Sequence, residues 1–299
     1  MKHLTIFFLL CLLIACGKKQ ESGNSTGDNK KNSSGDSTTV TKPSGESQKQ
    51  ESKVSDSPAF GTYTGGFEAL VYDETKDYVY ENRITISVDS LSGDMLYGHS
   101  VVAGNNRPFK GPYKIEGKIY KAEVTEPGDD KYDGKFVFNV DPAAGKLDGT
   151  WKANDKKLDV SERKYSLEKK KFKYEASNNL PEDVQWAALY EKNPKFPDKI
   201  ESLTGDVTKL NGSVKELTKK DVENLYKGDL EIIRNAIYAR HGYSFKTRRV
   251  RFIFDQYVPW YMPISTDVRI ELTEIEKKNI DLIKRYEEHA EKYYDEYGR

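Results

Sequence analysis

Two short stretches in the C-terminal third of the sequence carry side chains that could hold a ligand. Arg240 and His241 come at the end of a predicted helix, and Trp260 and Tyr261 follow after the next apolar segment. An arginine beside aromatic faces suits an anionic or sugar ligand, through bidentate hydrogen bonds and ring stacking. Together with Asn235, which lies earlier on the same predicted helix, these residues form our candidate binding groove.

The same residues also have a purely structural interpretation. Arg240 and His241 fall in the last turn of the helix, where a positive charge stabilises the helix terminus by about 0.3–1 kcal/mol. Gly242 sits where a left-handed glycine closes a helix. Asn235 would then tie a neighbouring loop by hydrogen bonds. On this interpretation the segment is a helix end clamped to the loop that carries Trp260 and Tyr261, and both interpretations stay open.

The sequence shows few residues arranged for catalysis. Its histidines are His3, His99, His241 and His289, and no two of them have the i, i+4 spacing of a zinc-binding helix. It has no Gly-x-Ser-x-Gly elbow and no phosphate-binding loop. The acidic run 126–130 could hold a weak cation, but turn chemistry explains it better. We therefore expect a non-enzymatic protein without metal or cofactor, and keep a carboxylate-based hydrolase as the less favoured alternative.

The first residues predict where the chain resides. Leu4–Ala15 is almost wholly apolar, too short to span a bilayer, and has the length of a secretory signal sequence. Its end, Leu13-Ile14-Ala15-Cys16, resembles the lipobox of bacterial lipoprotein signal peptides. The resemblance implies that residues 1–15 are removed and that Cys16 carries a diacylglyceryl group and fatty acyl chains such as palmitate. Gly17, in place of Asp, implies export to the outer membrane.

The segment 16–57 is predicted to be a disordered tether. It is rich in Ser, Gly and Lys and has no aromatic residue, so it cannot bury enough apolar surface to offset the entropy of ordering. Over the whole sequence, 48 Lys and Arg residues balance 48 Asp and Glu residues. No overall charge therefore favours nucleic acid as a partner.

The segment 58–174 is predicted to be an antiparallel β-barrel of about eight strands. Short runs such as Ile84–Val88 and Phe136–Val140 alternate apolar and polar residues and are separated by glycine-bearing turns. The stretches Gly61–Gly65 and Gly149–Trp151 resemble strands of lipocalin-like and avidin-like barrels. A barrel of this size is either filled by its own side chains or holds a small ligand, and we favour the filled barrel.

The segment 216–299 is predicted to be helical and 175–215 to be a connection, which gives an α+β multi-domain chain. Leu230, Ile233 and Ile237 form an apolar stripe at helical spacing. Thr218 with Asp221 and Thr273 with Glu276 have the spacing of capping boxes at two helix starts.

The stretch Tyr238-Ala239-Arg240-His241-Gly242 resembles the signature of the YARHG domain family. Trp260-Tyr261, Glu276, Asn279 and Ile283 fit its later elements, and the resemblance covers about residues 216–287. It implies a small extracellular bacterial module without established catalytic activity. We expect a lipid-anchored envelope protein with a binding or scaffolding role. Its expected partner is cell-wall glycan or peptide, or another protein of the envelope. The alternative is a carrier of a small ligand inside the barrel.

Overall fold

The computed structural model describes residues 56–193 and 196–294. The predicted signal segment 1–15, Cys16 and the predicted tether up to residue 55 lie outside the described residues. All described residues belong to one compact unit, Glu51–Arg299.

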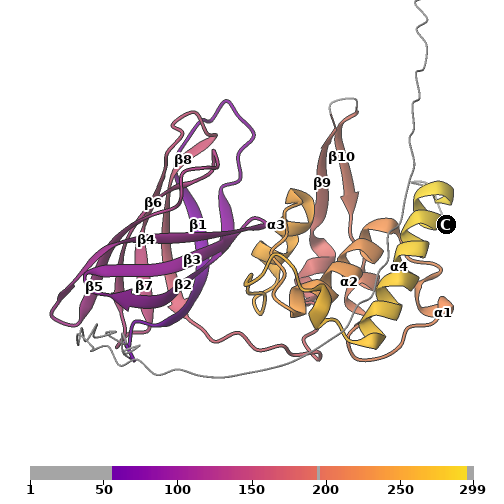
Figure 1. Ribbon diagram of the computed structural model, residues 1–299. Coiled ribbons are helices and arrows are strands. Elements are labelled where there is room, and N and C mark those ends of the chain that lie inside the picture. Colours follow the sequence, from indigo (N-terminus) through magenta and orange to yellow (C-terminus); the bar gives the residue numbers. More distant parts are fainter. Residues whose placement is uncertain (1–55, 194–195, 295–299) are drawn as a thin grey trace, which may run out of the picture. The chain divides into compact units, whose positions relative to one another are not determined.

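Among the described residues, eight antiparallel strands close into a barrel, as the sequence predicts (Figure 1). The strands are β1 (Gly61–Tyr72), β2 (Glu81–Ser92), β3 (Met95–Val102), β4 (Asn105–Glu116), β5 (Ile119–Thr125), β6 (Gly134–Asp141), β7 (Lys146–Ala153) and β8 (Val160–Lys169). Each strand pairs with the next one in the sequence, and β8 pairs with β1. Closure leaves no unpaired edge on this sheet.

Aromatic side chains fill the interior of the barrel. Residues along β6 alternate between buried and exposed, so that Phe136 and Phe138 point inward while Val137 is 47% exposed. The ring of Phe136 lies 6.5 Å from that of Trp151 and 6.0 Å from that of Tyr165. This packing favours the filled barrel over the ligand-carrying barrel.

A glycine on β6 makes room for one of these rings. A Cβ atom at Gly134 would lie 2.5 Å from the ring of Trp151 and 2.4 Å from the carbonyl oxygen of Lys152. Real Cβ atoms do not approach other atoms so closely, so only glycine leaves room for the indole at this point of the strand.

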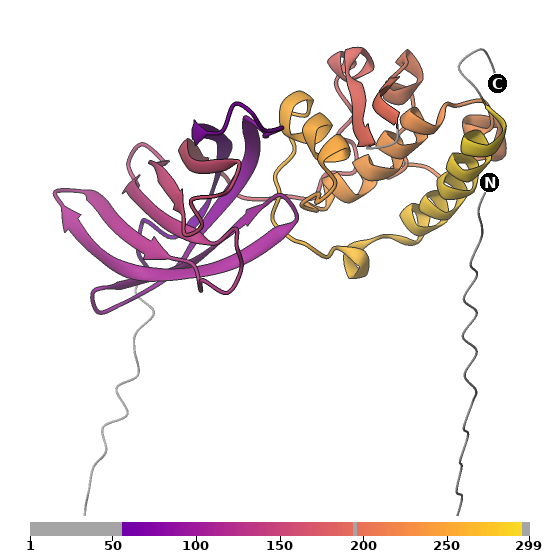
Figure 2. The ribbon, with the colours of Figure 1, turned by 90° about the horizontal axis from the view of Figure 1, so that it is seen from above.

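The C-terminal elements combine short and long helices with a two-stranded sheet (Figure 1). They are the 3₁₀ helix η1 (Glu182–Trp186), β9 (Ala188–Asn193), β10 (Phe196–Ser202), η2 (Gly205–Thr208), α1 (Lys219–Val222), α2 (Lys227–Arg240), α3 (Arg248–Tyr257), η3 (Arg269–Glu271) and α4 (Glu274–Tyr293). The two predicted capping boxes are present, at Thr218 before α1 and at Thr273 before α4. The long helix α4 packs along α2 (Figure 2).

The segment 175–215 has more structure than the connection that the sequence predicts. Leu180, Val184, Leu203 and Val207 are buried in the same apolar cluster as the helices α2, α3 and α4. Its elements are short 3₁₀ turns and a hairpin, which have too few residues for a clear apolar period. The core of the C-terminal region therefore begins near Leu180 rather than at residue 216.

Candidate functional site

The end of helix α2 is closed by a glycine in the left-handed conformation. Gly242 has φ = +75°, and its N–H donates to the carbonyl of Ala239. A Cβ atom here would lie 2.4 Å from the side chain of Ile264, so any other residue would be strained by both conformation and crowding. The reversed chain then leads Tyr243 into a short parallel bridge with Ser265.

His241 and Glu276 form a buried hydrogen-bonded pair behind this helix end. Nε2 of His241 lies 2.8 Å from Oε2 of Glu276, and the exposed fractions of the two side chains are 6% and 0%. The imidazole stacks on the ring of Tyr174, with centroids 4.3 Å apart. The hydroxyl of Tyr174 donates to Oε1 of Glu276 at 3.1 Å. Three segments far apart in the sequence are thus joined by one carboxylate.

Glu276 stays ionised because of its hydrogen bonds. Burial alone would raise its pKa, but hydrogen bonds from His241, Ser213 and the backbone of Thr273 lower the pKa from its ordinary 4.5 to about 2. The same oxygen that meets His241 accepts the N–H of Thr273 at 2.9 Å. Glu276 therefore caps α4 and holds the end of α2 at the same time.

Arg240 is buried, and its guanidinium is fixed by three contacts. Nε donates to the carbonyl of Asn178 at 2.7 Å, and Nη1 donates to Oγ of Ser213 at 3.2 Å. The guanidinium carbon lies 5.8 Å from the ring centre of Trp260. Burial lowers the pKa of Arg240 to about 10, which leaves it charged at neutral pH.

Trp260, Tyr261 and Asn235 each donate a hydrogen bond to a backbone carbonyl. Trp260 donates from Nε1 to the carbonyl of Asn179 at 2.8 Å, and Tyr261 is buried with its hydroxyl on the carbonyl of Tyr243. Asn235 does not tie a neighbouring loop as expected. Its amide donates to the carbonyl of Glu231 on its own helix, because that carbonyl lies one turn earlier and within reach.

Arg240, Trp260 and Tyr261 come together in one cleft with a volume of about 570 Å³, a size typical of ligand sites. Its other wall comes from the end of the barrel and the chain that follows β8. Five cationic side chains line the cleft against the single carboxylate of Glu168; they are Arg83, Lys170, Lys171, Lys173 and Arg240. His241 and Asn235 do not line it.

A barrel arginine holds the loop that carries Trp260. Nη1 of Arg83, on β2, donates to the carbonyls of Val258, Pro259 and Tyr261 at 2.8–3.3 Å. Its Nη2 donates to the carbonyl of Asp255 at 3.1 Å. These carbonyls belong to the end of α3 and to the loop after it. Arg83 therefore supplies donors that the helix end itself lacks.

Sequence reasoning missed the barrel side of this cleft. The basic run 169–173, Lys-Lys-Lys-Phe-Lys, was a visible signal, but a charge run by itself indicates only a solvated surface. Arg83 lies on a barrel strand, and the residues around it in the sequence do not indicate a binding role. Only the fold brings Arg83 and the basic run beside Arg240 and Trp260.

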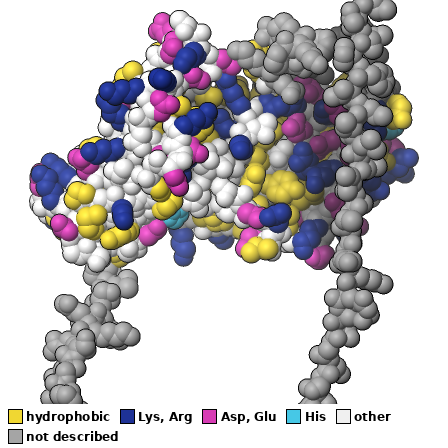
Figure 3. All heavy atoms as spheres, turned by 45° about the horizontal axis from the view of Figure 1, so that its top comes forward, with side chains coloured by type: hydrophobic (Ala, Val, Ile, Leu, Met, Phe, Trp, Pro, Cys, Tyr) yellow, Lys and Arg dark blue, Asp and Glu magenta, His cyan; other side chains and the backbone are white. Residues whose placement is uncertain are grey.

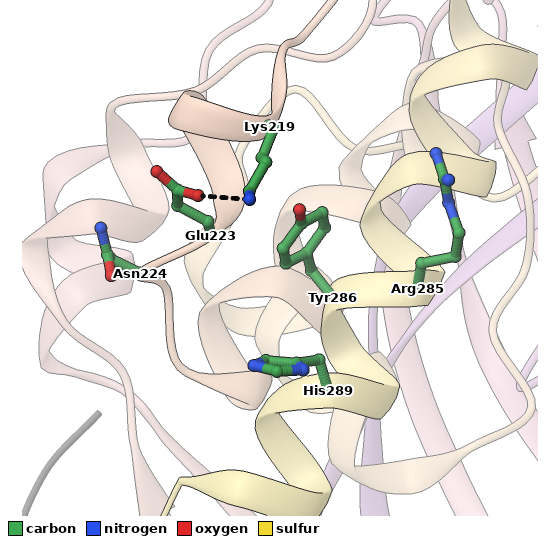
Figure 4. Close-up of a pocket in the computed structure, with 6 residues that line it drawn as sticks. All are labelled: Lys219, Glu223, Asn224, Arg285, Tyr286 and His289. Atoms are coloured by element: carbon green, nitrogen blue, oxygen red, sulfur yellow. Dashed lines mark ion pairs between the residues drawn. The ribbon is translucent and has the colours of Figure 1, made fainter.

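A second, shallow depression lies between α1 and α4 (Figure 4). Tyr286 and His289 extend from α4 toward α1, where Lys219 and Glu223 form an ion pair at 3.5 Å. None of the five predicted binding residues lines this depression. Lys219 and Glu223 pair with one another, and Nε of Arg285 donates to the carbonyl of Asp281 at 3.4 Å, so we do not place the candidate site there.

The acidic run 126–130 forms a hydrogen-bonded turn. Oδ2 of Asp133 accepts the N–H groups of Gly128 at 2.8 Å and Asp130 at 3.2 Å. The described part of the chain holds no group of three or more His, Cys, Asp or Glu residues placed to bind a metal ion. On the face shown in Figure 3, Lys and Arg side chains are interspersed with Asp and Glu.

These features define a class: an α+β protein in which an antiparallel barrel precedes a small helical module closed by a buried His–Glu pair. The model of the YARHG domain family matches residues 208–288, so this part of the chain is a YARHG domain. The domain is typical of extracellular and periplasmic proteins. Comparison with curated proteins and with solved structures found no match. No helix in the described ranges is both long and apolar enough to cross a membrane.

Proposed function

We propose that this protein is a lipid-anchored envelope protein that binds an anionic group of cell-wall glycan or peptide in the cleft around Arg240 and Trp260. The observation that carries the proposal is the composition of the cleft, in which five cations and one carboxylate surround an aromatic platform. Such a surface attracts carboxylate or phosphate groups and stacks on sugar rings.

The cleft also has cationic groups available to a ligand. Lys171 is exposed and has no ion pair among the described residues. Lys170 and Lys173 have only loose pairs, at 3.7 Å with Glu168 and at 3.5 Å with Glu175. Exposed ion pairs of this kind contribute little free energy. An anionic ligand can therefore replace the glutamate in either pair at low cost.

The arrangement favours binding over catalysis. The cleft has hydroxyl groups, but no histidine or cysteine lines it, and its carboxylate faces Lys170. A hydroxyl without an adjacent base is a weak nucleophile. We therefore assign the cleft a non-catalytic role.

Binding can be tested by retention of the whole protein on purified cell-wall sacculi. We expect Lys171→Glu and Trp260→Ala each to weaken retention about tenfold, the equivalent of one charge-assisted hydrogen bond or one stacked ring. Added salt should weaken binding of the unaltered protein, since the attraction is partly screened.

Two matched variants control for the general effect of these changes. Lys118→Glu makes the same charge change at an exposed barrel lysine, and Trp186→Ala removes a tryptophan that is 80% exposed outside the cleft. Both should be retained like the unaltered protein. If all four variants bind equally, the cleft is not the binding site.

The lipid anchor is proposed from Cys16 and has its own test. We expect Cys16→Ala to move the protein from the membrane fraction to the soluble fraction, because the acylated thiol would be lost. Cys11→Ala, within the apolar run, should leave the protein in the membrane fraction. Membrane retention of the Cys16→Ala variant would contradict the anchor.

A further inference from the structure

A separate cleft, with a volume of about 380 Å³, lies between helix α3 and the chain that enters β2. Its walls combine three aromatic rings, two carboxylates and two guanidinium groups. Arg83 separates it from the cleft around Trp260, because Arg83 lines the first cleft and holds the carbonyl of Asp255, which lines the second.

The aromatic rings of this cleft are exposed but held in place. Tyr80 is 50% exposed and Phe252 is 45% exposed. Tyr72 stacks on Tyr78 with centroids 4.3 Å apart and meets Tyr80 edge-on at 6.5 Å. A ligand that stacks on these rings would therefore not have to order them first.

The guanidinium groups of the cleft already donate to other groups. Arg248 pairs with Asp77 at 2.8 Å and donates to the carbonyl of Tyr78. Arg251 donates to Oδ1 of Asn82 at 3.1 Å and to the carbonyl of Lys246 at 2.7 Å. Arg248 is thus neutralised by Asp77, and burial raises the pKa of Asp255 to about 7, so the lining presents little free charge to select an ion.

The two carboxylates differ in exposure, since that of Asp255 is buried and that of Glu81 is partly exposed. Asp255 is only 6% exposed, and its Oδ2 has no hydrogen-bond partner among the described residues. Glu81 also lines this cleft. A ligand hydroxyl group that reaches this buried oxygen would supply the hydrogen bond that it lacks.

We propose that this cleft is a binding site for a neutral saccharide. The exposed rings of Tyr80 and Phe252 provide a stacking surface for a pyranose, and Asp255 and Glu81 accept hydrogen bonds from its hydroxyl groups. An organic cation would use the same rings, but the two guanidinium groups oppose it. The proposal is independent of the anionic site, since it involves different side chains and a ligand without charge.

The test is calorimetric titration of the whole protein with two uncharged probes, cellotetraose and the tetrasaccharide of N-acetylglucosamine. Tetramethylammonium chloride serves as the cationic probe. We expect at least one tetrasaccharide to bind at millimolar or lower concentration. Tyr80→Ala and Glu81→Gln should each weaken that binding about tenfold, whereas Tyr97→Ala, at an exposed barrel tyrosine outside the cleft, should leave it unchanged.

Asp255→Asn gives the second reading, because it keeps the size of the side chain and changes its hydrogen bonding. We expect it too to weaken saccharide binding about tenfold. Absence of binding by both tetrasaccharides would overturn the proposal, as would binding that survives Tyr80→Ala. Binding of tetramethylammonium alone would replace it with a cation site. The cleft around Arg240 and Trp260 is tested by a different experiment, the retention of the Lys171→Glu variant on sacculi. The two proposals can therefore fail separately.

Discussion

Glu276→Ala is expected to lower the free energy of unfolding of the helical region by about 3 kcal/mol, because each hydrogen bond to a charged acceptor contributes about 1.5–3 kcal/mol and several donors lose this one. The change leaves His241 buried without its carboxylate partner. The N–H and the hydroxyl of Thr273 also lose their acceptor, because both donate to Glu276. Urea unfolding of the whole protein, followed by the circular dichroism of the helices, measures the loss.

Glu274→Ala is the matched control, because Glu274 lies in the same first turn of α4. Its side chain is 83% exposed and forms an ion pair with Lys277, three residues later. Exposed pairs contribute about 0–1 kcal/mol, so this variant should unfold almost like the unaltered protein. Equal, small losses for both variants would show that the buried pair does not hold the region together.

The contribution of Glu276 should also depend on pH. Its pKa is about 2 in the folded protein, below the ordinary 4.5, so between these values the unfolded chain binds more protons than the folded one. The stability from this group is therefore complete above pH 4.5 and is lost as the pH falls toward 2. The difference in unfolding free energy between the unaltered protein and Glu276→Gln should shrink over that range.

Phe136→Ala is expected to destabilise the barrel by about 3–5 kcal/mol. The ring is 1% exposed and lies within 6.5 Å of the rings of Phe67, Phe109, Trp151 and Tyr165. Its removal leaves a cavity that the closed sheet cannot collapse to fill. Urea unfolding followed by tryptophan fluorescence measures the effect, since Trp151 lies beside the cavity.

Val137→Ala serves as the control for this prediction. Val137 is the next residue on β6, but it is 47% exposed on the outer face. Its truncation should change the unfolding free energy by about 0.5 kcal/mol or less. A small loss for Phe136→Ala would indicate a loosely filled barrel and would renew the case for a ligand inside it.

The features predicted correctly from the sequence are local ones. The capping boxes at Thr218 and Thr273 depend on residues three positions apart, and Gly242 on one residue at a helix end. The barrel strands follow from alternation within runs such as Phe136–Val140. Each of these signals is complete within a few neighbouring residues.

What could not be predicted depends on partners far apart in the chain. His241 was visible as a helix-end charge, but nothing near it indicates Glu276 as its partner. Lys171 was visible as part of a basic run, but its position beside Trp260 follows from the path of the chain after β8. For Asn235 we expected a partner in a neighbouring loop, but its amide donates to the carbonyl of Glu231 on its own helix.

The four hydrogen bonds that Arg83 donates limit how freely the C-terminal module can be recombined. They run from a barrel strand to carbonyls at the end of α3 and in the loop after it. A YARHG module transplanted onto an unrelated carrier would present those carbonyls without their donors. A functional chimera therefore has to inherit the barrel, or its new host has to provide a guanidinium at the same place.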